Sequence, residues 1–205
     1  MQPRHGQGYM TVGQMGILNS LGLLAISDDK IAGMISHLRK RKDFIDMKVP
    51  AINNQAKQIA TQLYQKCVQI IGGGFLEGAI HALRNTFHET SKNFADYFLL
   101  PEANHHLMEG LKFPSSNPDN LVFLMIKSSL YSQRIQQRYY LTKEVISNNG
   151  IEVVEINLTP TDKLTQNFEL LQLGNYIIFY LSMLYGLDPS KIPWVDYFKE
   201  NLGKQ

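Results

Sequence analysis

The sequence predicts an α/β protein, a three-layer sandwich in which a mostly parallel, doubly wound sheet is flanked by helices. Short apolar runs at residues 67–71, 121–126 and 151–158 alternate with longer segments whose apolar residues recur at helical spacing. The runs lack the polar–apolar alternation of a sheet with one wet face, so both faces should be buried. Strands that alternate with helices in this way are typical of parallel sheets.

The composition favours a globular protein over a nucleic-acid-binding or membrane-spanning one. The chain has 205 residues, 44% of them hydrophobic, with a formal net charge of +2. Its one dense basic run, residues 37–42, is more typical of a solvated helix face than of a nucleic-acid interface. The most apolar stretch, residues 176–187, is too short to span a bilayer. With one cysteine, Cys67, and no apolar leader at its start, we expect a cytoplasmic protein.

The first fifty residues should form a separate helical segment. Residues 11–24 carry apolar residues at helical spacing, and Ser27 offers an N-cap for a second helix that runs to about Asp46. We therefore divide the chain into an N-terminal helical segment, residues 1–50, and an α/β domain, residues 51–205.

Within the α/β domain, strands and helices follow one another with recognisable caps and turns. A helix with an apolar stripe leads directly into the first strand, and a run of three glycines then leads into the next helix. Asp162 caps a long helix that Gly186 ends. The predicted helices are residues 53–65, 76–92, 132–148, 161–185 and 189–202, and the predicted strands are residues 67–71, 97–100, 121–126 and 151–158.

The glycine run could in principle hold a phosphate group, because glycines allow a helix N-terminus to approach an anion closely. However, Gly72, Gly74 and Gly78 do not have the GxGxxG spacing of dinucleotide-binding proteins, and no ribose-binding acid follows. A simple tight turn is the better interpretation, and no cofactor is expected.

Acids and imidazoles cluster in the segment that follows the second predicted strand. His106 comes four residues after Glu102, and Glu109 comes four after His105, so two ion pairs along a short helix opened by Pro101 are possible. A metal site is the alternative. The two pairs point in different directions and the spacing supplies no third ligand, so a polar helix end is favoured and no metal is expected.

Glu89 is the acid with the most interesting position. Taken alone, Glu89 and Lys92 would form an ordinary surface ion pair. Together with His105, however, a carboxylate that faces a shared cavity could move protons between carbon and oxygen.

Several short motifs occur in one order along the domain, and together they resemble a known family. They are NNQAKQIATQL at residues 53–63, Ala82-Leu83-Arg84, Glu89-Thr90-Ser91-Lys92, Leu100-Pro101-Glu102-Ala103-Asn104-His105, Glu109-Gly110, Asp188-Pro189 and Lys199. In this order they resemble the second half of the bacterial and archaeal bifunctional phosphoglucose/phosphomannose isomerases, which are built from two sugar-isomerase (SIS) subdomains. The resemblance runs along most of the chain and implies an SIS-like fold.

The resemblance implies a role for each of four residues. Glu89 resembles the base that moves a proton between C1 and C2 of the sugar through a cis-enediol intermediate. His105 resembles an imidazole that helps to open the sugar ring in the partner subunit's site, which implies a homodimer. Lys199 resembles a lysine that donates to the ring oxygen, and Arg4 an arginine that stabilises the enediolate. The implied reaction interconverts glucose 6-phosphate and fructose 6-phosphate, with mannose 6-phosphate as a further substrate.

The family's first SIS half, which carries a Ser/Thr-rich loop for the sugar phosphate, has no counterpart in these residues. We therefore expect either a C-terminal piece of a two-half enzyme or a relative that needs a separate N-terminal SIS half. Two other hypotheses remain open. The chain could be a non-catalytic SIS-type module that binds a sugar phosphate or regulates a partner, or a dimerisation remnant that binds no ligand.

Overall fold

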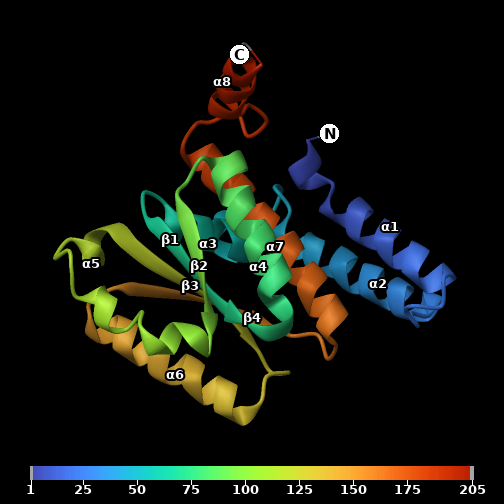
Figure 1. The fold of residues 1–205 in the computed structure, drawn as a ribbon, viewed down its shortest axis with the longest axis horizontal. Helices are drawn as coiled ribbons and strands as arrows, with labels where there is room; N and C mark the ends of the chain where they lie inside the picture. The colour runs from blue at the N-terminus through green and yellow to red at the C-terminus, as the bar shows by residue number, and fades with distance from the viewer. Residues whose placement is uncertain (1, 204–205) are drawn as a thin grey trace.

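The structure is a computed structural model that describes residues 2–203. Four parallel strands form one sheet in the order β2-β1-β3-β4, with helices on both faces (Figure 1). The strands are β1 (Cys67–Gly73), β2 (Ala95–Leu100), β3 (Leu121–Ser128) and β4 (Glu152–Leu158). The helices are α1 (Gln7–Ser20), α2 (Asp28–Ile45), α3 (Gln55–Leu63), α4 (Glu77–Thr86), α5 (Asn117–Asn120), α6 (Gln133–Asn148), α7 (Lys163–Leu184) and α8 (Pro193–Leu202). The predicted α/β sandwich with a parallel sheet is confirmed.

Two apolar cores lie between the sheet and the helices that cover its two faces. The larger lies between the sheet and helices α3, α4 and α7, and it includes Ile70, Leu83 and Ile177. The smaller lies on the opposite face, where α6 packs through Tyr139 and Ile146. The two central strands, β1 and β3, are buried on both faces, which is why their sequences are almost continuously apolar.

Helix α2 is attached to the α/β core through a buried acid. Glu169 of α7 is 1% exposed, and its carboxylate lies 2.8 Å from Nε2 of His37 and 3.3 Å from Nε of Arg41. A buried carboxylate is costly unless it is paired, so these two partners fix α2 against α7. Part of the basic run is thus engaged in packing, although Arg39 and Lys40 remain exposed.

Most predicted elements are confirmed, and the differences lie at their ends. Ser27, Asn54, Ser132 and Asp162 all cap helices through their side chains. The first helix lies earlier than predicted, at residues 7–20 rather than 11–24, and the last begins at Pro193 rather than at residue 189. The predicted glycine turn is wrong in part, since two of its residues extend β1 and Gly74 alone has a positive φ, of 53°.

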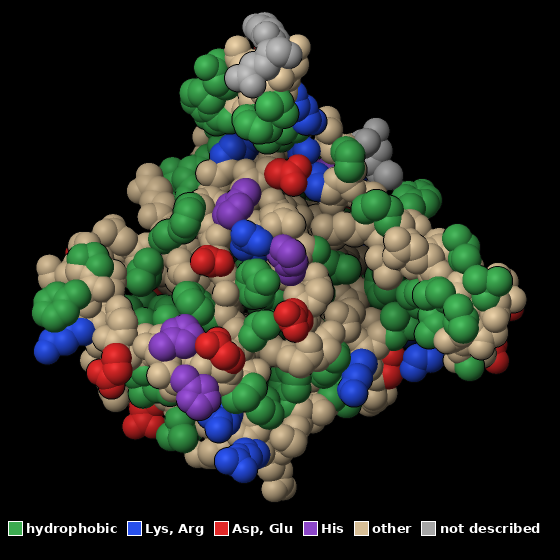
Figure 2. Space-filling view, viewed as in Figure 1, with side chains coloured by type: hydrophobic (Ala, Val, Ile, Leu, Met, Phe, Trp, Pro, Cys, Tyr) green, Lys and Arg blue, Asp and Glu red, His purple; other side chains and the backbone are tan. Residues whose placement is uncertain are grey.

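Two helices expose much of their apolar surface. Helix α1 has no buried residue, and Tyr9 and Ile17 are 79% and 62% exposed. Helix α8 also has no buried residue, and its Trp194 is 81% exposed. Figure 2 shows the corresponding hydrophobic groups at the right, over α1, and at the top, over α8. Within residues 2–203, no helix combines the length and apolarity needed to cross a membrane.

The end of β1 passes so close to β2 that only glycine fits at position 73. A Cβ atom on Gly73 would lie 2.6 Å from the carbonyl oxygen of Leu100, which is a backbone atom and cannot move aside easily. We expect Gly73→Ala to lower the free energy of unfolding by about 1–3 kcal/mol through overpacking. Gly78 of α4 is the matched control, because nothing lies within 4 Å of its Cβ position.

Gly78→Ala should be neutral or stabilise the protein by up to about 1 kcal/mol, because alanine favours helix. Urea unfolding of both variants measures the difference. Equal stabilities for the two variants would contradict the close approach of β1 and β2.

Candidate functional site

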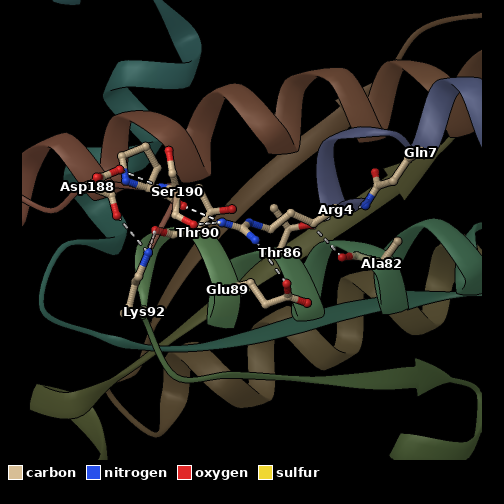
Figure 3. Close-up of polar contacts among 10 residues, drawn as sticks. Arg4, Gln7, Ala82, Thr86, Glu89, Thr90, Lys92, Asp188 and Ser190 are labelled. Carbon is tan, nitrogen blue, oxygen red and sulfur yellow. Dashed lines mark hydrogen bonds and ion pairs between the residues drawn. The ribbon is translucent and has the colours of Figure 1, made fainter. Parts of the chain in front are cut away.

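The candidate site is organised around a buried arginine near the start of the chain. Arg4 lies in a short 3₁₀ turn, Pro3–His5, and its side chain is only 4% exposed. Its Nη2 donates hydrogen bonds of 2.8 Å to the carbonyl oxygens of both Pro189 and Ser190, in the loop between α7 and α8. Its Nη1 lies 3.4 Å from Oε2 of Glu89 (Figure 3). Arg4 thus joins three segments that are far apart in the sequence.

Glu89 is presented by an irregular helical turn. Helix α4 ends at Thr86 and continues as a π-helical turn, Phe87–Ser91, instead of the regular helix predicted to residue 92. Such wide turns are frequent at functional sites. The Glu89 side chain remains 41% exposed, so its carboxylate faces solvent on one side and Arg4 on the other.

Lys92 does not pair with Glu89, and the surface ion pair considered from the sequence is wrong. The backbone of Lys92 is left-handed, with a φ of 55°, as the chain leaves the π turn. Its Nζ donates instead to the carbonyl oxygens of Thr90 and Asp188, at 3.0 and 3.1 Å. Lys92 therefore holds the loop before α8 against the π turn, beside the same loop that Arg4 holds.

The charge of Arg4 affects the titrating groups around it. Burial lowers the pKa of Lys92, and the positive charge of Arg4 lowers it further. Burial also lowers the pKa of His5, and Arg4 adds to that effect, whereas Asn175 and the negative charge of Glu89 act in the opposite direction. Burial and the positive charge of Arg4 therefore both favour the neutral forms of Lys92 and His5.

His105 and Glu89 lie at opposite ends of strand β2. The π turn, which carries Glu89, is next to the start of β2. Nε2 of His88, in the turn, lies 2.8 Å from the carbonyl oxygen of Ala95, the first residue of β2. His105 follows the end of the same strand, in the 3₁₀ turn Glu102–His105. A six-residue strand spans about 20 Å, so one chain does not bring His105 to Glu89. The side chain of Asn104 fixes this turn, because it donates to Thr142 at 2.8 Å and accepts from Arg138 at 3.1 Å.

Lys199 lies on α8 and is exposed to solvent. Its helix begins three residues after Ser190, whose carbonyl oxygen binds Arg4, so α8 leaves the body of the protein close to the candidate site (Figure 1). Of the four predicted site residues, the structure brings together Arg4 and Glu89. It places Lys199 on the exposed helix α8, which begins beside the loop that binds Arg4, and His105 beyond the end of β2 that is far from Glu89.

The cluster of acids and imidazoles forms one of the two pairs that its spacing suggested. His106 Nε2 lies 3.0 Å from Glu102 Oε1, and both side chains are more than half exposed. Across residues 2–203, no group of three or more His, Cys, Asp or Glu side chains is arranged to hold a metal ion.

The partners that fix Arg4 have no signal in the sequence. They are the main-chain carbonyl groups of Pro189 and Ser190, and main-chain groups carry no residue signature. The arrangement can hold an anionic oxygen near Nη1 of Arg4 while the Glu89 carboxylate accepts a proton from a group on its solvent side.

His5 reports the charges of this site in solution. In an NMR titration we expect its pKa to lie below about 6.5, the ordinary value for histidine. Glu89→Gln should lower the pKa further, because it removes a negative charge that favours the imidazolium. Arg4→Gln should raise it, because a repelling positive charge is lost. A His5 pKa that is unchanged by both substitutions would contradict the proximity of the three groups.

Comparisons with known proteins agree with this fold. Over 205 residues the chain is 27% identical to the bifunctional phosphoglucose/phosphomannose isomerase of Caldicellulosiruptor bescii, and it covers 60% of that protein. It is 22% identical to the Aquifex aeolicus protein of the same name, and the matched region covers 99% of this chain and 59% of the relative. The chain thus spans about three fifths of these curated relatives.

Among solved structures, the chain is similar to a glucose-6-phosphate isomerase-like protein from Thermus thermophilus. The TM-score is 0.69 at 20% identity, over 87% of this chain and 59% of the other. At that identity the likeness concerns the fold. The model of the bacterial phospho-glucose isomerase C-terminal SIS domain matches residues 52–202, which is most of the chain. The chain therefore belongs to the family of bacterial phosphoglucose isomerase C-terminal SIS domains.

Proposed function

We propose that this chain supplies the C-terminal half of an aldose–ketose isomerase that interconverts glucose 6-phosphate and fructose 6-phosphate. Mannose 6-phosphate is a further substrate in this proposal, since the relatives are named phosphoglucose/phosphomannose isomerases. The observation that carries the proposal is the contact between the buried guanidinium of Arg4 and the solvent-facing carboxylate of Glu89.

This contact provides the two functions that an enediol mechanism needs. Moving a hydrogen between C1 and C2 requires a base that takes the proton from one carbon and returns it to the next. The exposed side of the Glu89 carboxylate is placed for that role. Negative charge then develops on the sugar oxygens, and a fixed guanidinium stabilises it without reorganisation. Arg4 is fixed by its two carbonyl partners, so it can serve as that group.

The remaining two groups require movement or a second chain. Lys199 would assist ring opening by donating to the ring oxygen, and its exposed helix begins next to the Arg4 loop. His105 lies at the far edge of its own sheet, so it can act at a Glu89 site only if a second copy presents it. We therefore propose a two-fold homodimer in which each copy lends His105 to the other.

A separate N-terminal SIS half is the second proposed partner. The chain spans about three fifths of its curated relatives, and the exposed apolar helix α1 precedes the matched domain. In this proposal the other half provides the residues that hold the phosphate group.

A non-catalytic SIS-type module is the alternative function. It is favoured by the distance between His105 and Glu89 within one chain, which leaves the catalytic set incomplete in a single copy. This alternative predicts saturable binding of a sugar phosphate without turnover, both alone and in the presence of the N-terminal half. It also predicts tolerance of substitutions at Lys199.

Glu89→Gln tests the assignment of the base. In a protein that contains both halves, we expect isomerisation to fall by about 10²–10⁴-fold, because an amide cannot accept the proton. Binding of fructose 6-phosphate should remain within a few-fold of the wild type. A coupled assay of glucose 6-phosphate formation measures the first quantity, and calorimetry measures the second.

Glu77→Gln is the control, since Glu77 lies on the exposed side of α4, outside the site. It should leave the rate unchanged. An active Glu89→Gln enzyme would remove the assignment of the base, and a wild type that binds but never turns over would favour the alternative module.

Mixing two inactive variants tests the shared imidazole. Glu89→Gln and His105→Ala should each be inactive as pure dimers. When the two are unfolded and refolded together, mixed dimers contain one site with an intact Glu89 from one copy and an intact His105 from the other. We expect activity to return in the mixture. If the mixture stays inactive while mass spectrometry detects mixed dimers, His105 is not exchanged between copies.

A further inference from the structure

A cavity of the described chain lies away from Arg4 and Glu89. It has a volume of about 540 Å³ and is formed by α6 together with the ends of β3 and β4. Ser128 and Ser129 line it where β3 ends, and Asn157 lines it where β4 ends. In open α/β sheets, ligands bind outside the carboxyl ends of the strands where the strand order reverses, and β3 is one of the two strands at that point here. The volume is also in the range of small-molecule sites.

Two lysines converge on one acid inside this cavity. Lys127 of β3 and Lys143 of α6 lie 3.0 and 2.9 Å from the two different oxygens of the Glu155 carboxylate. Their attraction lowers the pKa of Glu155 in spite of its partial burial, so the acid remains ionised at neutral pH. The three side chains together carry a charge of +1.

Each ammonium group keeps donors for another partner. A lysine has three N–H donors, and one on each lysine is used by Glu155. The lysine side chains are 40% and 43% exposed, so a solute can reach them. The carboxylate holds both lysines in place, which lowers the entropic cost of presenting them to an anion.

Hydroxyl and amide groups lie around this pair of lysines. Ser128, Ser129, Ser147 and Asn157 line the cavity and can bind the hydroxyl groups of a ligand. The ring of Tyr140 forms part of the wall. A second acid, Glu144, is exposed and balances the total charge of the lining, so the attraction for anions is confined to the lysine pair.

We propose that this cavity is a second binding site, for a small phosphate ester that carries hydroxyl groups. The phosphate binds to Lys127 and Lys143, and the hydroxyl groups bind to the serines and Asn157. A phosphate dianion suits two neighbouring ammonium groups because its oxygens can accept from both. The neutral remainder of the ligand suits the serines, Asn157 and Tyr140 that lie around the lysine pair.

The site is distinct from the candidate active site. The cavity lies beside β3 and β4, at one side of the sheet, whereas Glu89 is next to the start of β2, the strand at the opposite side. Ligand in the cavity therefore does not contact Arg4 or Glu89 of the same chain. This inference does not depend on the proposed isomerase activity, because it concerns binding alone.

An NMR titration of the ¹⁵N-labelled 205-residue chain tests the proposal. With glucose 6-phosphate, the amide signals of Ser128, Ser129 and Asn157 should shift saturably. Inorganic phosphate should shift them with weaker affinity, and glucose should not shift them. No shift of these signals at millimolar glucose 6-phosphate would overturn the site. Equal affinities for the ester and for inorganic phosphate would overturn the role of the hydroxyl groups.

Variants separate this site from the active site. Lys143→Met should weaken binding at these amides by about tenfold or more, as expected for the loss of a charge-assisted hydrogen bond. Lys127→Met is the second variant, and thermal unfolding checks that both are folded. Glu155→Gln should bind at least as tightly as the wild type, because the loss of a negative charge makes the lysine pair more attractive to an anion and the amide oxygen can still accept from a lysine. Lys48→Met, in the exposed turn after α2, is the matched control and should bind normally.

Glu89→Gln gives the distinguishing result. Binding at the cavity should be unchanged in this variant, whether or not Glu89 is a catalytic base. If the shifts disappear in Glu89→Gln and persist in Lys143→Met, the ligand occupies the active site and the second site is excluded. If Glu155→Gln folds but loses binding, the two lysines do not form the anion site.

Discussion

The arrangement of the candidate site depends on the burial of one charged group. The Arg4 side chain is almost fully removed from water, and a buried charge is costly unless donors of the charged group find acceptors, as Nη1 and Nη2 do here. The loop before α8 supplies two carbonyl oxygens, and the π turn supplies a carboxylate. Because all three partners must be in position together, the N-terminal turn, the end of α4 and the start of the α8 segment form one unit. Residues outside the matched domain thus contribute directly to the site within it.

Much of the fold could be predicted because its elements have strong local signals. The apolar strands β1 and β3 and the capping residues Ser27 and Asp162 identify their elements without tertiary information. The ends of α1 were predicted less well, because its exposed apolar residues follow no buried face. The π turn is not predictable from the sequence, because FHETS is compatible with ordinary helix and contains no local signal for wider winding.

The candidate site shows a different limit. Arg4, Glu89, His105 and Lys199 were identified by their order along the chain, which resembles a family, and not by any local pattern. Spacing alone suggested a Glu89–Lys92 pair, which does not form. The contact between Arg4 and Glu89 joins residues 85 positions apart, and no periodicity in the sequence encodes it. Within one copy, His105 follows the far end of β2 from Glu89, and Lys199 lies on the exposed helix α8.

The π turn that carries Glu89 also determines how this site can change. An α-helix advances by about 100° per residue, so a turn that contains one additional residue redirects every side chain after it. If one residue were removed between Phe87 and Ser91, the chain could resume regular winding and the carboxylate would rotate away from the guanidinium. An insertion or deletion in this short segment can therefore break the contact between Arg4 and Glu89 while Glu89 itself is still present in the sequence. In this chain, the number of residues in the turn matters to the pairing as much as the presence of the acid.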